Sequence, residues 1–209
     1  MGSRREFCQR VMRNVYGDFP SADSSITENL VNSYLGVGIG MAARNAYRDS
    51  IQIDGISYIN NSFYTTFKGL TLSKNEQFLY QMILPQIPVG IGKNEGVASL
   101  NIKTADGSLS YDAIPINANQ VGYYRNMSRK PPRLVYYSEG IFAYVFSVLQ
   151  LNIGYTANIR MISGGDSSNL DSVLNIPADY ETFCFDYCVE KLRLERNTPK
   201  DILNDGNDN

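Results

Sequence analysis

This chain of 209 residues contains no histidine, so it lacks the side chain that most often acts as a general base in catalysis. That absence excludes Ser-His-Asp and Cys-His arrangements and removes the commonest zinc ligand. A hydrolase would instead need two carboxylates about 5–10 Å apart. The candidate carboxylates are Asp106, Asp112 and Asp166. They occur in Gly/Ser-containing stretches such as 105–108 and 165–168, where an aspartate accepts hydrogen bonds from the backbone of its own turn. We therefore expect these aspartates to be turn residues, and we expect that the chain is not an enzyme.

The cysteines offer a metal or redox site as the alternative chemistry. Cys8, Cys184 and Cys188 are too few, and odd in number, for a disulfide framework, so we expect reduced thiols. Cys184 and Cys188 are four residues apart on one predicted helix face, which favours burial in the core over metal binding. Residues 201–206 superficially resemble a calcium loop, but Leu203 takes a ligand position. We expect no metal and no cofactor.

Gly36, Gly38 and Gly40 superficially resemble a phosphate-binding glycine loop. A dinucleotide-binding loop needs a strand before it and a helix that starts at it, whereas here a helical pattern precedes the glycines and continues through 41–43. We therefore expect either close packing of a neighbouring element against these small residues or a local break in the helix.

Two basic segments are candidates for contact with a partner. The predicted helix over residues 4–16 carries one basic face, formed by Arg4, Arg5, Arg10 and Arg13. Residues 123–133 contain no acidic residue and include Tyr123, Tyr124, Arg125, Arg129, Lys130 and Arg133. A solvated loop is the simplest interpretation of the second segment, and an acidic partner protein or a nucleic acid are the functional ones.

Composition narrows the class of protein. The formal net charge of -2 gives no field that would attract nucleic acid or an anionic membrane in general. No apolar run approaches the roughly 18 residues of a transmembrane helix, so we expect a protein of a cytosol-like compartment with no membrane partner. The 15 tyrosines, with no tryptophan, fit contacts between subunits and also fit sugar binding.

The expected fold is α+β. Helical periodicity predicts helices over 4–16, from a capping box at 25–28 to about residue 49, and from Pro177 to 196. Asp54-Gly55 predicts a β-hairpin between 51–53 and 56–59. Further strands are predicted at 63–67 and near 69–72, 78–83, 97–103, 109–116, 134–138, 141–149 and 154–162.

These elements predict one α+β domain over residues 1–196, helical at 4–49, β-rich at 51–162 and helical again at 177–196. Short turns between successive strands favour an antiparallel barrel or sandwich. The Pro/Gly-punctuated residues 81–90 are expected to form an extended connection that crosses the core. A polar tail follows over residues 197–209.

Three segments carry a resemblance to a known class of protein. The segments are Ile83-Leu84-Pro85-Gln86-Ile87-Pro88-Val89-Gly90-Ile91-Gly92, residues 174–181 at the start of the late helix, and Thr198-Pro199-Lys200-Asp201. With the order of elements, they resemble the ring or head-to-tail connector proteins of short-tailed phages, with the crAss-like phages as the nearest match. The similarity covers most of the chain as an arrangement, through short motifs.

This resemblance implies a virion protein made in the host bacterial cytoplasm. It would form a ring of many copies beneath the portal protein, as a portal adaptor or tail-tube ring that extends the DNA channel. Its partners would be copies of itself, the portal and neighbouring tail rings, with non-specific proximity to packaged DNA. The family offers no catalytic residues to transfer.

Two other classes of function stay open from the sequence. A carbohydrate-binding β domain, or another non-catalytic interaction module, would use exposed tyrosines in a shallow groove and would be a monomer. A histidine-free hydrolase would lose its activity when one Asp or Glu of its pair is replaced.

Overall fold

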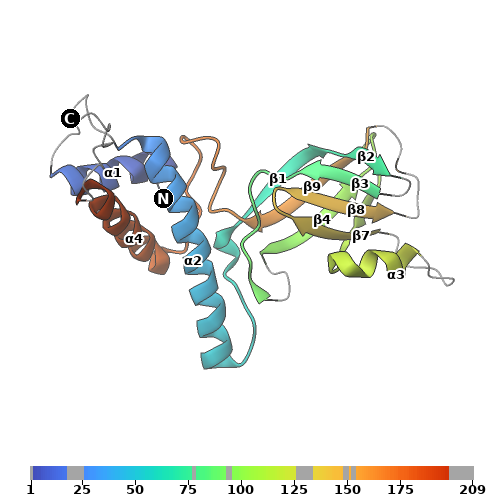
Figure 1. The fold of residues 1–209 in the computed structure, drawn as a ribbon, viewed down its shortest axis with the longest axis horizontal. Helices are drawn as coiled ribbons and strands as arrows, with labels where there is room; N and C mark the ends of the chain where they lie inside the picture. The colour runs from blue at the N-terminus through green and yellow to red at the C-terminus, as the bar shows by residue number, and fades with distance from the viewer. Residues whose placement is uncertain are drawn as a thin grey trace, which may run out of the picture.

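The computed structural model describes residues 2–17, 26–76, 79–92, 96–125, 134–147, 151 and 154–197. Its long helices gather at one end of an elongated molecule and its sheets at the other (Figure 1). The helical end contains α1 (Arg4–Tyr16), α2 (Glu28–Asp54) and α4 (Ala178–Asn197). The α+β class, with two N-terminal helices and one late helix, is therefore confirmed, while the predicted tail beyond 197 lies outside the described residues.

Local hydrogen bonds fix the starts of the first two helices. Glu6 N–H donates to Ser3 Oγ at 3.2 Å and Ser3 N–H donates to Glu6 Oε2 at 2.9 Å, so α1 begins with a capping box. At the start of α2, Leu30 N–H donates to Thr27 Oγ1 at 3.2 Å. The N-cap is therefore Thr27, two residues later than the predicted capping box places it.

The predicted hairpin around Asp54-Gly55 is wrong. Residues 51–54 form the last turn of α2, and Gly55 N–H donates to the Ile51 carbonyl at 3.1 Å, with a φ of 66° at Gly55. A glycine with positive φ ends a helix as readily as it forms a hairpin turn, so the dipeptide alone does not choose. Each residue that extends a helix gains a bond to its own preceding turn, whereas a strand at 51–53 would need a partner strand.

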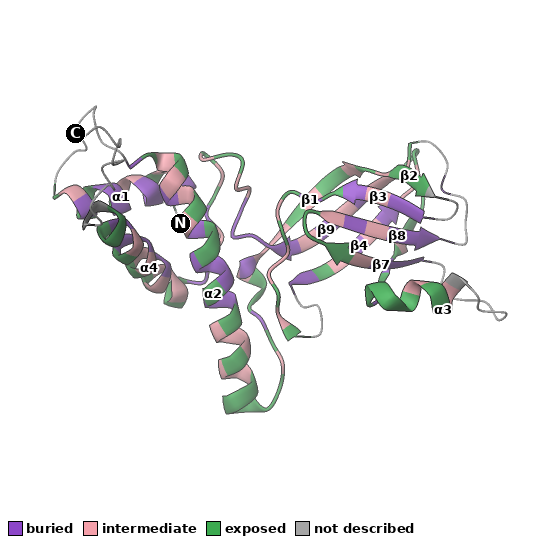
Figure 2. Cartoon of the chain, viewed as in Figure 1, coloured by how far each residue is buried: buried purple, intermediate pink, exposed green. Residues whose placement is uncertain are grey.

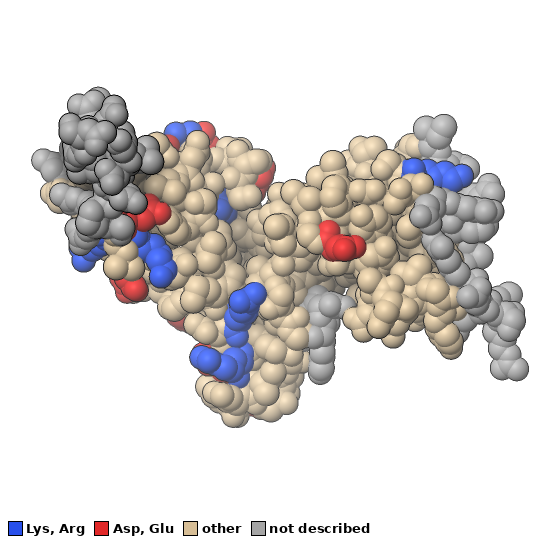
Figure 3. Space-filling view, viewed as in Figure 1, with Lys and Arg blue, Asp and Glu red and all other residues tan. Residues whose placement is uncertain are grey.

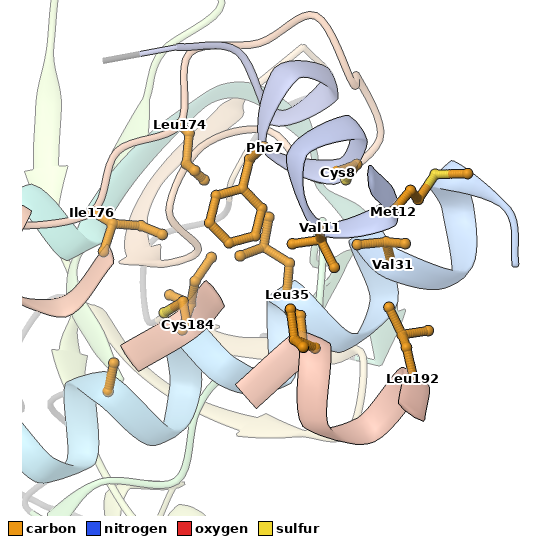
Figure 4. Packing of buried hydrophobic residues seen from close by; sticks show 14 of the residues in the cluster. Phe7, Cys8, Val11, Met12, Val31, Leu35, Leu174, Ile176, Cys184 and Leu192 are labelled. Atoms are coloured by element: carbon orange, nitrogen blue, oxygen red, sulfur yellow. The ribbon is translucent and has the colours of Figure 1, made fainter. Parts of the chain in front are cut away.

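The three long helices pack around one hydrophobic cluster (Figure 4). It contains Phe7 and Val11 of α1, Leu35 of α2, Cys184 and Leu192 of α4, and Leu174 and Ile176 of the segment before α4. Complete burial of one such side chain contributes about 1.5–3 kcal/mol. This cluster therefore holds α1 and α4, which are far apart in sequence, against α2.

The cysteines belong to this cluster. Cys8, Cys184 and Cys188 are free thiols and fully buried, as expected. Burial raises the pKa of Cys8 to about 11 and the pKa values of Cys184 and Cys188 to about 12. At pH 8 the reactive thiolate is therefore scarce at all three positions.

We expect none of these thiols to react with a disulfide reagent in the native protein at pH 8. After denaturation in guanidinium chloride all three should react, and the absorbance of the released thiolate counts them. Rapid labelling of a native thiol would contradict the packing of α1 against α4.

The strands lie in two sheets. One has the order β1-β9-β4-β5 and consists of β1 (Tyr64–Thr71), β9 (Thr156–Ile162), β4 (Val97–Lys103) and β5 (Ser110–Asp112). The other has the order β2-β3-β8-β7-β6 and consists of β2 (Ser73–Glu76), β3 (Leu79–Ile83), β8 (Phe142–Ser147), β7 (Leu134–Glu139) and β6 (Ile114–Pro115). Most of the predicted strands are present, and the pairs are antiparallel apart from β6 with β7, which is parallel.

Both sheets contribute side chains to a second hydrophobic cluster. Met82 and Val145 come from one sheet, and Leu100, Ile102 and Ile159 come from the other. The described strands do not close into a barrel. The chain passes between sheets at two bends, Leu72 between β1 and β2 and Ala113 between β5 and β6, so each bent segment pairs with a different sheet on either side of its bend.

The predicted extended connection over residues 81–90 begins inside β3, which ends at Ile83, and the segment 84–92 continues from there with Leu84 buried in the second hydrophobic cluster. It runs beside α2, where Arg44 Nε donates to the Gly90 carbonyl at 3.1 Å. Gln86 Nε2 donates to the Ile162 carbonyl at 2.6 Å and so ties the segment to the end of β9. Ile87 is exposed, which places an apolar side chain on the surface next to α2.

Candidate interaction surface

Arg4 is not part of a basic surface, because its side chain is 0% exposed. Arg4 Nε donates to Asn32 Oδ1 at 2.9 Å, and Arg4 Nη1 donates to the carbonyls of Ser163 and Gly164 at 3.3 and 3.1 Å. These bonds join α1 to α2 and to the loop after β9. Burial lowers the pKa of the Arg4 guanidinium, and Nη2 has no hydrogen-bond partner among the described residues. The predicted interface role of Arg4 is therefore wrong, and its role is structural.

The other arginines of α1 are closer to solvent, and two of them make ion pairs within the chain. Arg5 Nη1 lies 2.8 Å from Glu28 Oε2, and Arg5 Nε lies 2.7 Å from Asp171 Oδ1. Arg10 Nη1 lies 2.8 Å from Glu181 Oε1. Arg13 is exposed on the same helix. On the face seen in Figure 3, acidic and basic side chains lie close together at this end of the molecule.

The second predicted basic segment is described only in part. Tyr123 and Tyr124 lie in α3 (Val121–Arg125), a short helix that follows the 3-10 turn η3 (Ala118–Gln120). The Tyr123 ring is 65% exposed and stands edge-on to Tyr124 at 5.6 Å between centroids. Arg125 ends this helix, and Arg129, Lys130 and Arg133 lie outside the described residues. Among the side chains of this segment whose burial is described, that of Tyr123 is exposed and is the candidate for contact with a partner.

The candidate carboxylates do not converge on a reaction centre. Asp106 accepts from Ser108 N–H at 3.1 Å, and the bonds from Thr104 and Ser108 lower the pKa of Asp106 to about 2. Asp166 accepts from Ser168 N–H at 3.0 Å, so both are turn residues as predicted. Asp112 differs, because it lies on strand β5 and bonds to Asn101 of β4.

Two further kinds of site have no counterpart in the part of the chain that the structure describes. No group of three His, Cys, Asp or Glu side chains there is placed to hold a metal ion. None of the helices described is both long and apolar enough to cross a lipid bilayer.

The most unusual surface is the end of α2, because it leaves the body of the molecule. Every buried residue of α2 lies between Val31 and Ala43, and no residue from Arg44 to Tyr58 is buried. The helix has 27 residues, so at a rise of 1.5 Å per residue it is about 40 Å long. Its second half projects away from α1 and α4, with half-buried and exposed residues alternating until residues 51–54, which are all exposed (Figure 2).

We call residues 51–58 the α2 tip, since apolar side chains are concentrated there. Ile53 is 81% exposed and Ile56 is 67% exposed, and Ile51 and Tyr58 are exposed beside them. Scattered exposed apolar side chains are normal in soluble proteins, but a contiguous group marks an interaction site. Four such side chains lie within eight residues of the chain, so we treat the α2 tip as a candidate interaction site.

The α2 tip is held in place by its own hydrogen bonds. Ser50 Oγ lies 2.9 Å from the carbonyl oxygens of both Tyr47 and Tyr58 and donates its one proton to either of them, while Tyr58 N–H donates to Ser50 Oγ at 3.1 Å. Together with the Gly55 cap, these bonds hold the returning chain against the last turns of the helix. The apolar side chains are thus presented on an ordered support, which lowers the entropy lost when a partner binds.

The three glycines of α2 have three different surroundings. A side chain at Gly38 would meet the Tyr187 ring at 3.2 Å, and one at Gly40 would meet Val89 at 3.3 Å, so both glycines allow close packing as predicted. A side chain at Gly36 would meet nothing within 4 Å. The helix is continuous through all three, so the alternative of a local break is wrong.

Gly36 and Gly40 are among the residues that line a groove between α2 and the segment 86–90, which we call the α2 groove. Its walls include the exposed side chains of Val37, Met41 and Ile87. Its volume is about 330 Å³. An apolar cavity of about 150 Å³ already holds a benzene-sized group, so the α2 groove has room for more than one aliphatic side chain. Arg44 lies at its edge.

None of the protein-family models compared with the chain matches it, and neither does any curated protein sequence. No role of a residue can therefore be transferred from a relative. We therefore infer the function of the chain from the α2 tip and the α2 groove.

Neither surface was among the residues predicted from the sequence. The hairpin prediction gave Ile51, Ile53 and Ile56 a place in a sheet. Their spacing of two and three residues does not follow one face of a helix, so a helix that ends at residue 54 cannot bury all of them in its own core. That mismatch between helix and apolar pattern is the signal that could have located the α2 tip.

Proposed function

We propose that this chain is a structural virion protein that assembles with copies of itself into a ring in the tail connector of a short-tailed phage. The ring stacks on the portal or a neighbouring tail ring and extends the DNA channel. The observation that carries this proposal is the ordered, apolar α2 tip at the end of a helix that projects from the body. Exposure of a projecting apolar element to water is unfavourable in free energy, and a neighbouring protein that covers the element removes its apolar surface from water.

Two further observations support assembly. The face of the sheet region seen in Figure 3 carries few charged side chains, and depletion of charge is typical of the centres of protein interfaces. The order of elements and the three short motifs resemble connector proteins of short-tailed phages. This resemblance, together with the tip, favours a ring over other assemblies.

The test is the mass of the purified protein, measured with and without a portal ring. We expect the wild-type chain to form species many times heavier than the 23.4 kDa subunit and to bind the portal. Replacing both Ile53 and Ile56 with aspartate should weaken self-association by at least ~100-fold. Each isoleucine loses about 1.5–3 kcal/mol of burial, and each new carboxylate would have to enter an apolar interface.

The control is Leu109→Asp, because Leu109 is also a large apolar side chain that is more than half exposed but lies in the turn between β4 and β5. This variant should assemble like the wild type. A wild-type chain that stays a folded monomer at high concentration, and that ignores the portal, would refute the proposed function.

A further inference from the structure

We propose that the α2 tip of one copy inserts into the α2 groove of the next copy, so that one-way contacts of this kind link the subunits. This inference rests on the proposed function and specifies its interface. Both surfaces are present on every copy: the tip supplies projecting apolar side chains, and the groove supplies a hollow whose lining combines apolar side chains with the polar side chains of Ser33, Gln86 and Arg44. The occupant of the groove is therefore a second copy of this chain.

The two surfaces cannot meet within one copy. Met41 of the groove and Ile53 of the tip lie twelve residues apart on the same continuous helix, a separation of about 18 Å along its axis. An uninterrupted helix does not fold back on itself, so the tip of a copy cannot reach its own groove. Contact between them requires another molecule.

The open space in the groove and its apolar side chains suit the isoleucines of the tip. Ile53 and Ile56 are exposed at the tip, and at Gly36 the groove has open space where a side chain would meet nothing within 4 Å. Val37, Met41 and Ile87 would then surround the inserted side chains. Residues that are exposed in the single copy become buried on both sides of the contact.

Charge also agrees. Asp54 lies between the two isoleucines of the tip, and Arg44 lies at the edge of the groove. Arg44 uses Nε to bond the Gly90 carbonyl, and a guanidinium has further N–H donors at its end. An ion pair from Asp54 of one copy to Arg44 of the next would fix the direction of insertion.

Direction decides the type of assembly. If two copies exchanged tips mutually, the product would be a closed two-fold dimer. If each copy gives its tip to the next and receives one from the previous copy, the contact is heterologous and continues into a ring. The proposed ring requires the second arrangement.

The experiment uses cysteines placed on the two surfaces of the full chain, Ile53→Cys and Met41→Cys, separately and in one double variant. The native cysteines are buried, so they do not compete. Each protein is treated with an oxidant or a short bifunctional maleimide and separated under denaturing conditions. We expect the double variant to give a ladder of covalent multimers, the mixed single variants to give a dimer, and each single variant alone to stay monomeric.

Other outcomes overturn the inference in distinguishable ways. A double variant that stops at the covalent dimer shows mutual exchange, and a dimer from Ile53→Cys alone shows tip-to-tip contact; both reject one-way insertion. Intact assembly without any cross-link rejects the tip-in-groove contact but leaves the ring. Absence of assembly, for the wild-type chain as well, rejects the proposed function itself.

A second variant keeps the inference testable if cysteines disturb the tip. Gly36→Leu fills part of the groove, and a side chain at Gly36 meets nothing within 4 Å in the single copy. The fold should therefore survive while the groove is blocked. We expect at least a tenfold loss of assembly with unchanged helical content, and an unchanged assembly would contradict the occupation of the groove.

Discussion

Replacing Arg4 with alanine is expected to lower the free energy of unfolding by about 3–4 kcal/mol. The variant loses three hydrogen bonds from a charged donor, each worth about 1.5–3 kcal/mol, and leaves Asn32 Oδ1 and two buried carbonyls without these partners. Relief of the desolvation of the guanidinium offsets part of this loss. The remaining loss falls on the junction of α1, α2 and the loop after β9.

Denaturation in urea, followed by circular dichroism, measures this change. Assembly adds apparent stability, so the comparison is made in the background of the Ile53→Asp and Ile56→Asp changes, in which the chain is expected to be monomeric. Arg4→Lys should recover less than half of the loss, because one ammonium group cannot reach three acceptors in different directions. Arg48→Ala is the control, since Arg48 is exposed and should change stability by no more than about 0.5 kcal/mol. An Arg4→Ala variant as stable as this control would contradict the structural role of Arg4.

The second large effect is expected at Gly38. Gly38→Leu should destabilise the monomer by about 2–3 kcal/mol, because the new side chain must displace the Tyr187 ring and approaches the backbone of Cys184, 3.8 Å from the first added carbon. The change would push α4 away from α2. It would therefore open the cluster that holds the three helices together.

Gly36→Leu is the matched variant for this prediction. It makes the same substitution two residues earlier in the same helix, where the added side chain is unobstructed. Replacing a helical glycine with leucine should raise the free energy of unfolding by about 0.5–1 kcal/mol. The midpoints of urea denaturation should thus move in opposite directions. Equal shifts would show that the close approach of α2 and α4 is not what Gly38 permits.

Gly36→Leu also separates folding from assembly. The same change is expected to stabilise the single copy and to weaken the contact between copies. Such opposite effects are hard to explain if Gly36 serves only the helix, because a residue kept for stability alone would not be glycine in the middle of a helix. They follow directly if the missing side chain makes room for the tip of a neighbour.

The sequence by itself determined the features that depend on neighbouring residues. The helix over residues 4–16, the helical stripe with Cys184 and Cys188, the turn at Asp106 and most of the strands were all predicted correctly. Caps, turns and periodic burial are set by hydrogen bonds and side-chain spacing within a few residues, so a short stretch of sequence contains their cause.

Only the tertiary structure decided which of several locally acceptable outcomes occurred. Arg4 fits an exposed helix face equally well by its position, and it is buried because Asn32 and the loop after β9 offer acceptors there. Asp54-Gly55 fits a hairpin or a helix end. Gly36 and Gly38 are identical in sequence terms, but only Gly38 faces α4. Burial depends on which distant segments of the chain contact one another, and a short stretch of sequence does not specify those contacts. The groove, which lies between α2 and the segment 86–90, is therefore visible only in the tertiary structure.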